Sequence, residues 1–128
     1  MKHKVIIKKP NETAKVQYIE SGLEELQNIV DGYIEYPYLE KFYEKGISII
    51  VNEEGKFMDL EPSIALNHKG QMIDYYCGNV IFVGTKETED GNENDSLTDE
   101  QIDFVKKYVF NGLKCITTKG NVLDVISL

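Results

Sequence analysis

The sequence "MIDYYCGNVIFVG", residues 72–84, is the most apolar stretch of this chain and predicts its central β-strand. Aromatic and β-branched residues dominate it, and these residue types favour strands. Gly78 interrupts the pattern, which indicates either a bulge or a close approach by another segment. Residues 80–83 are apolar without alternation, so we expect them at the centre of a sheet.

The residues just before this stretch predict a hairpin and a short helix. In "GISIIVNEEGKFMDL", residues 46–60, we expect two strands, 47–51 and 56–59, joined by a glycine-containing turn. In the following "EPSIALNHKG", Pro62 suits the first position of a helix. This segment therefore predicts one short helix or 3₁₀ turn that ends at Asn67.

The N-terminal part predicts further strands. "KVIIKK" (4–9) and "KVQYIE" (15–20) are rich in β-branched residues, and we expect them to pair across a short loop. In "GYIEYPYLE" (32–40) the chain is again extended. Pro37 cannot donate a backbone hydrogen bond, which indicates that this strand lies at a sheet edge or is broken there.

Two other segments predict helices. Ser21 and Glu24 have the spacing of a capping box, so we expect a helix at about 22–31 with Gly32 as its left-handed end. Apolar residues recur at helical spacing near the C-terminus and predict a second helix at about 98–112. The last residues predict a small hairpin.

The order of these elements indicates the fold class. Strands dominate the middle of the chain, which favours an α+β fold over alternating βαβ units. At 128 residues with 41% hydrophobic composition, the chain is long enough for one core. We expect a single domain over residues 1–128, with a mostly antiparallel sheet and two main helices.

The stretch "DGNENDSLTDEQ", residues 90–101, partly resembles an EF-hand calcium loop. Its sixth position lacks glycine, and its twelfth holds Gln101 in place of a bidentate glutamate. Thr98 and Gln101 have the spacing of a capping box, and Leu97 and Ile102 that of a hydrophobic staple. We therefore expect a helix start here and no calcium site.

The net charge of −8 comes mainly from residues 87–100, which carry seven acidic side chains and no basic one. We expect an acidic, solvated loop at 87–95. A DNA mimic would spread its acidic groups over a longer face, so this clustering does not favour that function. All basic residues are lysines, which lack the bidentate contacts of arginine, and direct nucleic-acid binding is not expected.

The sequence offers few candidates for catalysis or metal binding. His3 and His68 lack further ligands at a zinc-like spacing, so we expect no metal and no other cofactor. Glycine-rich phosphate loops and the G-x-S-x-G motif are absent. Cys77, His68 and Asn79 are close in sequence, but a nucleophilic group requires hydrogen-bond geometry that such proximity does not supply. An enzymatic role is not indicated.

The cellular compartment follows from two further features. No apolar run has the length of a signal peptide core or a membrane span, so we expect a cytoplasmic protein without membrane contact. Cys77 and Cys115 are far apart and lack a C-x-x-C context. We expect both to be reduced and buried.

Two groups of residues are candidates for binding. Six of the eight tyrosines lie between residues 33 and 76, where they could line a pocket or a partner surface, or pack across strands. Polar turns around the central strands add amide and carboxylate groups, although turn geometry alone also favours asparagine and glycine. The predicted binding face consists of Tyr33, Tyr36, Tyr38, Asn52, Glu53 and Asn79.

Several of these segments together resemble the DUF3846 family of small bacterial proteins, often met in phages and other mobile elements. The similarity rests on "GYIE" (32–35), "NEEG" (52–55), the strand 78–84 and "SLTDEQ" (96–101), and covers about residues 4–110. The resemblance implies one α+β domain and a mobile-element setting, and it carries no established reaction. The acidic loop at 87–95 and a C-terminal extension at 113–128 look like additions to the family pattern.

The function that we expect is that of a non-enzymatic accessory protein of a mobile element or phage. It would bind a host protein or a small ligand and so modulate host physiology or defence. The alternative is a nucleotide-binding or nucleotide-acting protein, in which the tyrosines stack on a base. The sequence leaves the partner and the oligomeric state undetermined.

Overall fold

Two β-sheets and three helices make up residues 2–128, the part of the chain that the computed structural model describes. The first sheet has the strand order β2-β1-β7-β4-β3, and β8 pairs with β7. The second has the order β6-β5-β10-β9. The strands of the first sheet are β1 (Lys2–Lys8), β2 (Lys15–Glu20), β3 (Ile34–Glu35), β4 (Ile47–Asn52), β7 (Val80–Thr88) and β8 (Gly91–Asp95). Those of the second are β5 (Pro62–His68), β6 (Gln71–Cys77), β9 (Leu113–Ile116) and β10 (Val122–Ser127).

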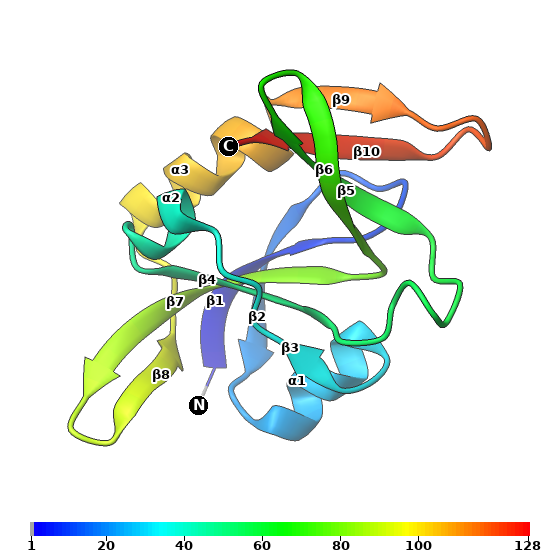
Figure 1. Ribbon diagram of the computed structural model, residues 1–128. Coiled ribbons are helices and arrows are strands. Elements are labelled where there is room, and N and C mark those ends of the chain that lie inside the picture. Colours follow the sequence, from blue (N-terminus) through cyan, green and yellow to red (C-terminus); the bar gives the residue numbers. More distant parts are fainter. Residues whose placement is uncertain (1) are drawn as a thin grey trace.

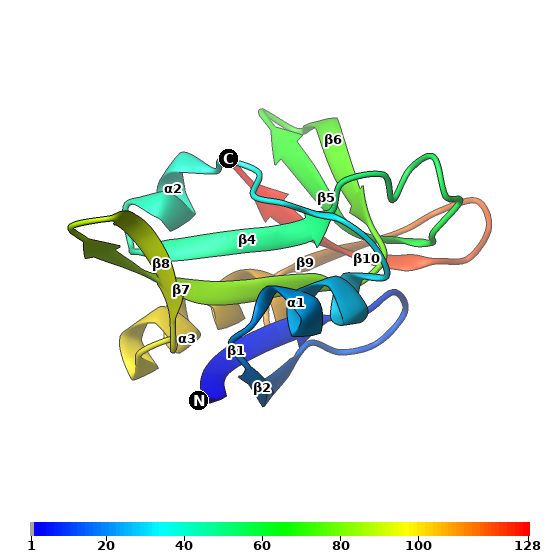
Figure 2. The same cartoon turned by 90° about the horizontal axis from the view of Figure 1, so that it is seen from below.

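The three helices are α1 (Leu23–Val30), α2 (Glu40–Tyr43) and α3 (Asp99–Val109). Helix α1 lies on one face of the first sheet, and the second sheet and α3 lie beyond the other face (Figures 1 and 2). Two of the three apolar clusters in the described residues border the first sheet and follow from this layering. The smaller joins α1 to the first sheet, and the larger fills the space among both sheets, α2 and α3. The expected α+β class with mostly antiparallel pairing is confirmed, although the strands form two sheets.

The prediction that residues 80–83 lie at a sheet centre is confirmed. Strand β7 pairs with β1 on one side and β4 on the other, and these four residues are at most 1% exposed. Gly78 marks the corner where the chain passes from β6 to β7. Its φ is +80°, and a Cβ there would lie 2.8 Å from Cδ1 of Leu60. Gly78 therefore permits both the turn and the close contact with Leu60 at the point where the chain passes from the second sheet to the first.

The predicted strand 47–51 is confirmed as β4, but its hairpin pairing with a strand at 56–59 and the short helix ending at Asn67 are both wrong. Strand β4 pairs with β7 and β3, and residues 53–59 form turns that lead to the second sheet. Residues 62–68 form β5, in which Ile64 and Leu66 alternate toward the larger core. Pro62 is tolerated because it is the first residue of the strand.

Helix α1 is close to its predicted range, but both of its predicted ends are wrong. Gly22 is the N-cap, and no side chain caps it, so the Ser21–Glu24 capping box does not form. Asp31 adopts the left-handed conformation, with φ 63°. Gly32 serves a different purpose, because a Cβ at this position would lie 2.8 Å from Nδ2 of Asn52.

The start of α3 is as predicted. The Thr98 amide donates to Oε1 of Gln101 at 2.9 Å, and the Gln101 amide donates to Oγ1 of Thr98 at 3.2 Å. Leu97 and Ile102 are both buried, consistent with a hydrophobic staple. The helix ends earlier than predicted, at Val109, and Leu113 begins β9.

The predicted C-terminal hairpin is confirmed as β9 and β10, which are antiparallel. Strand β10 also pairs in parallel with β5, so this segment is part of the second sheet. Cys115 lies in β9 and is exposed, which corrects the prediction that both cysteines are buried; Cys77 is buried.

The acidic loop predicted at 87–95 is instead a β-hairpin. Strand β8 pairs with β7 in a regular register from Gly84 opposite Asp95 to Thr88 opposite Gly91. Its charged side chains still lie in solvent, but its backbone extends the first sheet (Figure 1). Within residues 2–128, no helix is long and apolar enough to cross a membrane.

Candidate functional site

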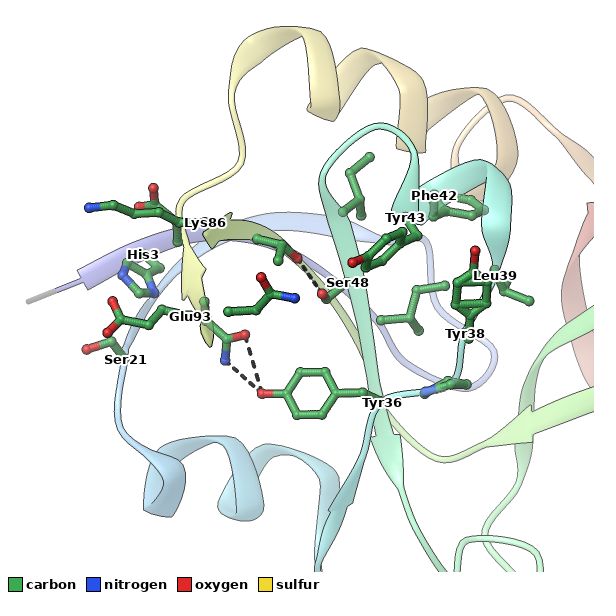
Figure 3. Close-up of a pocket in the computed structure, with 17 residues that line it drawn as sticks. His3, Ser21, Tyr36, Tyr38, Leu39, Phe42, Tyr43, Ser48, Lys86 and Glu93 are labelled. Atoms are coloured by element: carbon green, nitrogen blue, oxygen red, sulfur yellow. Dashed lines mark hydrogen bonds between the residues drawn. The ribbon is translucent and has the colours of Figure 1, made fainter. Parts of the chain in front are cut away.

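A pocket of about 800 Å³ lies on the first sheet, between the β7–β8 hairpin and the segment 36–43. Figure 3 shows His3, Ser21 and Glu93 at one end, Tyr38, Leu39 and Tyr43 at the other, and Ser48 and Tyr36 between them. The lining residues are His3, Ser21, Tyr36, Pro37, Tyr38, Leu39, Phe42, Tyr43, Ile47, Ser48, Ile49, Thr85, Lys86, Asn92, Glu93, Asn94 and Asp95.

The floor of the pocket is the part of the sheet face that α1 does not cover. Where α1 packs, this face carries Ile50 and Val83. Because side chains alternate along a strand, Ser48 and Thr85 lie on the same face, two residues further along β4 and β7. Their hydroxyls hydrogen bond to each other. The sheet face thus changes from apolar under the helix to polar under the pocket.

The aromatic wall follows from the short β3 strand. Strand β3 ends at Glu35, and Pro37 two residues later cannot donate to β4, so the chain leaves the sheet edge there. Tyr36, Tyr38 and Tyr43 line the pocket and are 49–65% exposed. The rings of Tyr38 and Tyr43 lie 5.3 Å apart at an angle of 42°. These tyrosines present ring surface to the pocket that no core contact occupies.

The opposite wall comes from the β7–β8 hairpin. Asn94 pairs with Thr85 and therefore faces the pocket with it. The Asn94 Nδ2 donates to the Tyr36 hydroxyl at 3.0 Å, and that hydroxyl lies 3.3 Å from Oδ1 of Asn94 (Figure 3). Asn92 lies two residues from Asn94 on the same face and also lines the pocket. A tyrosine–asparagine contact thus connects the two walls.

The six residues of the predicted binding face divide into two groups, Tyr36 and Tyr38 in the pocket and the other four near the end of α1. Tyr36 and Tyr38 line the pocket described above. Tyr33 instead borders a shallow hollow beside the end of α1. Glu53 is exposed, and its backbone amide donates to the Tyr33 carbonyl at 2.9 Å.

The two predicted asparagines are hydrogen bonded to the end of α1. Asn52 is 6% exposed, and its Nδ2 donates to the Val30 carbonyl at 2.8 Å. Its Oδ1 accepts from the Glu54 amide at 2.7 Å. Asn79 donates from Nδ2 to the Ile29 carbonyl at 2.9 Å. Both satisfy carbonyls that a helix end leaves without partners.

Sequence reasoning missed the residues on the floor and on the hairpin wall. Ser48 is the one detectable signal, because it is the single polar residue among residues 47–51 of β4. Asn92 and Asn94 looked like loop residues, since nothing local indicated that their segment pairs with β7. Tyr43 belongs to the tyrosine-rich part of the chain, but nothing local distinguishes it from the other tyrosines there.

The pocket presents side chains suited to binding, whereas the candidate nucleophile Cys77 and its candidate base His68 are not brought together. His68 and Cys77 lie at opposite ends of the β5–β6 hairpin, opposite Gln71 and Pro62 respectively. Burial raises the pKa of the Cys77 thiol, which opposes thiolate formation. Among residues 2–128, no group of three or more His, Cys, Asp or Glu side chains is placed to hold a metal ion.

Comparison with known proteins gives one match. A family model described as a domain of unknown function, DUF3846, matches residues 1–109 of the 128. The chain belongs to the DUF3846 family. The whole pocket lies inside the matched DUF3846 region, whereas β9 and β10 lie outside it. No curated protein and no solved structure matches the chain.

Proposed function

We propose that this DUF3846 protein is a non-enzymatic binding protein whose pocket takes a small polar molecule. The observation that supports this most is the pocket itself. Its volume of about 800 Å³ lies within the range of small-molecule sites, about 300–1,000 Å³. Such sites combine apolar and aromatic walls with a few placed polar groups. In this pocket, three tyrosines supply the aromatic wall, and the polar groups come from Ser48, Thr85 and two asparagines.

The wider setting of this function is also a proposal. The mobile-element association of the family resemblance supports an accessory role, in the cytoplasm, that acts on host physiology or defence. Sequestering or sensing a small host molecule fits that role, because it requires binding and no catalytic group.

A nucleotide is the second candidate for the ligand. Tyrosine rings can stack on a base, and the amides of Asn92 and Asn94 can hydrogen bond to its edge. The charge of the hairpin opposes a phosphorylated form, since Glu93 and Asp95 line the pocket with one lysine, Lys86. A base or nucleoside therefore fits better than a nucleoside polyphosphate.

A thermal-shift screen of small polar metabolites, nucleosides and nucleotides tests binding at this site. A ligand that binds only the folded state stabilises it by about 2.7 kcal/mol at a hundred times its Kd. We expect at least one compound to raise the melting temperature of the wild type, and to raise it less in the Tyr36→Ala/Tyr38→Ala variant.

The matched control is Tyr18→Ala, because Tyr18 is 65% exposed like Tyr38 but lies on β2 away from this pocket. Its ligand-induced shift should equal that of the wild type. A screen in which no compound stabilises the protein, or in which the double variant responds like the wild type, would reject the pocket as the binding site.

A further inference from the structure

We infer that the ligand of this pocket is an organic cation, with an ammonium group seated against the tyrosine wall. This inference rests on the proposed function, since it names the chemical class of ligand for the same site. It follows from the free faces of the pocket tyrosines, from the charge around them and from the polar end of the pocket.

The first observation is that four aromatic rings elsewhere in the described residues have a lysine over them, whereas the pocket tyrosines, like the exposed rings of Tyr18, Tyr33 and Phe57, have none. Within residues 2–128, lysine ammonium groups lie 4.5–5.9 Å from the ring centroids of Phe104, Tyr108, Tyr75 and Phe110. No lysine of this described part lies in this way over Tyr36, Tyr38 or Tyr43. Apart from the mutual contact of Tyr38 and Tyr43, the solvent-exposed parts of these three rings are therefore available to a cation from outside.

The second observation is the sign of the charge at the pocket. Residues 85–95 carry five acidic side chains and one lysine, and the whole chain has a net charge of −8. Glu93 lies at the edge of the pocket, at the end away from Tyr38 and Tyr43 (Figure 3), and its carboxylate has no hydrogen bond or ion pair with any residue of the described chain. Asp95 also lines it, and one of its oxygens accepts from the Ser96 amide at 2.8 Å. Such a field attracts cations and repels anions.

The third observation concerns the rest of the ligand. A pocket of about 800 Å³ is larger than an ammonium group requires. The end opposite the tyrosines contains His3, Ser21 and Glu93 (Figure 3). The hydrogen-bonding groups of His3 and Ser21 there suit a polar body attached to the cation. The ligand class is thus an alkylated or primary amine that also carries hydroxyl, carbonyl or amide groups.

Choline and its uncharged carbon isostere 3,3-dimethyl-1-butanol test this inference, because they differ in charge and hardly in shape. Binding is measured by NMR titration of the complete protein with each compound, and adenosine serves as a neutral aromatic ligand. Each ring contributes roughly two- to fivefold in affinity at exposed sites. Choline should therefore bind about tenfold or more tightly than its isostere and shift the tyrosine resonances of the pocket.

Variants identify the groups responsible. Tyr38→Leu keeps apolar bulk but removes the ring, and it should weaken choline binding roughly two- to fivefold. Glu93→Gln removes one charge at the opposite end of the pocket, so it should weaken choline less than Tyr38→Leu does and leave the isostere unchanged. Tyr18→Leu is the matched control and should change neither.

The outcomes separate this inference from the proposed function. Equal affinity for choline and its isostere, tighter binding of adenosine, or no binding of choline would overturn the cation inference. Binding of a neutral ligand that Tyr36→Ala/Tyr38→Ala weakens would leave the pocket function standing. Loss of choline binding in Tyr18→Leu as well would also overturn the inference, because it would place the cation elsewhere.

Discussion

Individual asparagines illustrate how one residue type serves two different purposes in this protein. Asn94 is partly exposed and hydrogen bonds to Tyr36 across the pocket. Asn52 is buried and holds the end of α1 to β4, while the absence of a side chain at Gly32 leaves room for it. The amide group is identical in both cases. Its burial and its partners, which depend on the fold, decide which purpose it serves.

Replacing Asn52 by alanine should destabilise the protein without touching the pocket. The change leaves the Val30 carbonyl and the Glu54 amide without their partner. A buried polar group that loses its hydrogen bond costs about 1–3 kcal/mol, so the free energy of unfolding should fall by that amount. Urea denaturation measures it.

Asn28→Ala is the control for this prediction, because Asn28 lies exposed on the same helix. Its free energy of unfolding should stay within about 0.5 kcal/mol of the wild type. If Asn52→Ala were equally neutral, the side chain would not be holding the end of α1.

Among the elements, α3 starts where its local signals indicate, whereas the capping box predicted for α1 does not form. Helix α3 has its capping box and staple within residues 97–102, so it needs no distant contact to define its start. Strand β5 is the opposite case. Its sequence carries a proline suited to a helix start, but pairing with both β6 and β10 decides its conformation. Long-range pairing of this kind has no short sequence signature.

The edge position of β9 leads to a prediction about thiol reactivity. Strand β9 has β10 on one side only, and Cys115 is exposed, whereas Cys77 is 6% exposed. Burial also raises the pKa of Cys77, which lowers its thiolate fraction at neutral pH. We expect a thiol reagent at neutral pH to modify Cys115 rapidly in the native protein, and both cysteines after unfolding.

The Cys115→Ser variant provides the control and should lose the rapid reaction. Mass spectrometry of the labelled peptides assigns the site directly. Rapid modification of Cys77 in the native protein would contradict the burial of the end of β6.

At the scale of the whole molecule, a buried ion pair joins the two sheets. The Nζ atom of Lys8 in β1 lies 3.9 Å from Oδ2 of Asp124 in β10, and the two side chains are 3% and 2% exposed. The Lys8 ammonium donates to the carbonyls of Lys9 and Glu12 at 2.6 and 2.7 Å. Burial lowers the pKa of Lys8, and attraction to Asp124 opposes that shift. Lys114 of β9 hydrogen bonds to the other Asp124 oxygen.

Removing one partner of this pair should destabilise the protein strongly. Asp124→Leu leaves the Lys8 charge buried without its counter-ion, and such changes cost about 3–5 kcal/mol. The Lys8→Met/Asp124→Leu double variant should recover much of that loss, because it removes both charges. Chemical denaturation of both variants measures the difference.

The exposed pair of Lys15 and Glu12 provides a comparison, with side chains 65% and 52% exposed. Lys15→Met should change the free energy of unfolding by at most about 1 kcal/mol. A loss from Asp124→Leu no larger than that from Lys15→Met would show that the buried pair does not stabilise the contact between the sheets.

The candidate site was predictable only in part. Tyr36 and Tyr38 stood out because tyrosines cluster around Pro37, and Pro37 does break the strand there. The asparagines of the hairpin wall could not be recognised, since residues 87–95 show the composition of a solvated loop. Their pairing with β7 is a long-range contact, and this contact turns a charged loop into one side of a pocket.

The sequence by itself determined the α+β class, the central position of residues 80–83, the start of α3 and the hairpin at the C-terminus. Each of these depends on hydrophobic pattern or on hydrogen bonds between near neighbours, so a short segment contains the necessary information. Only the tertiary structure decided that the strands form two sheets, that β10 lies parallel to β5, and that the face beyond α1 is open. These features depend on which segments, distant in the sequence, pack against each other and bury their apolar side chains, and that is decided only when the whole chain folds.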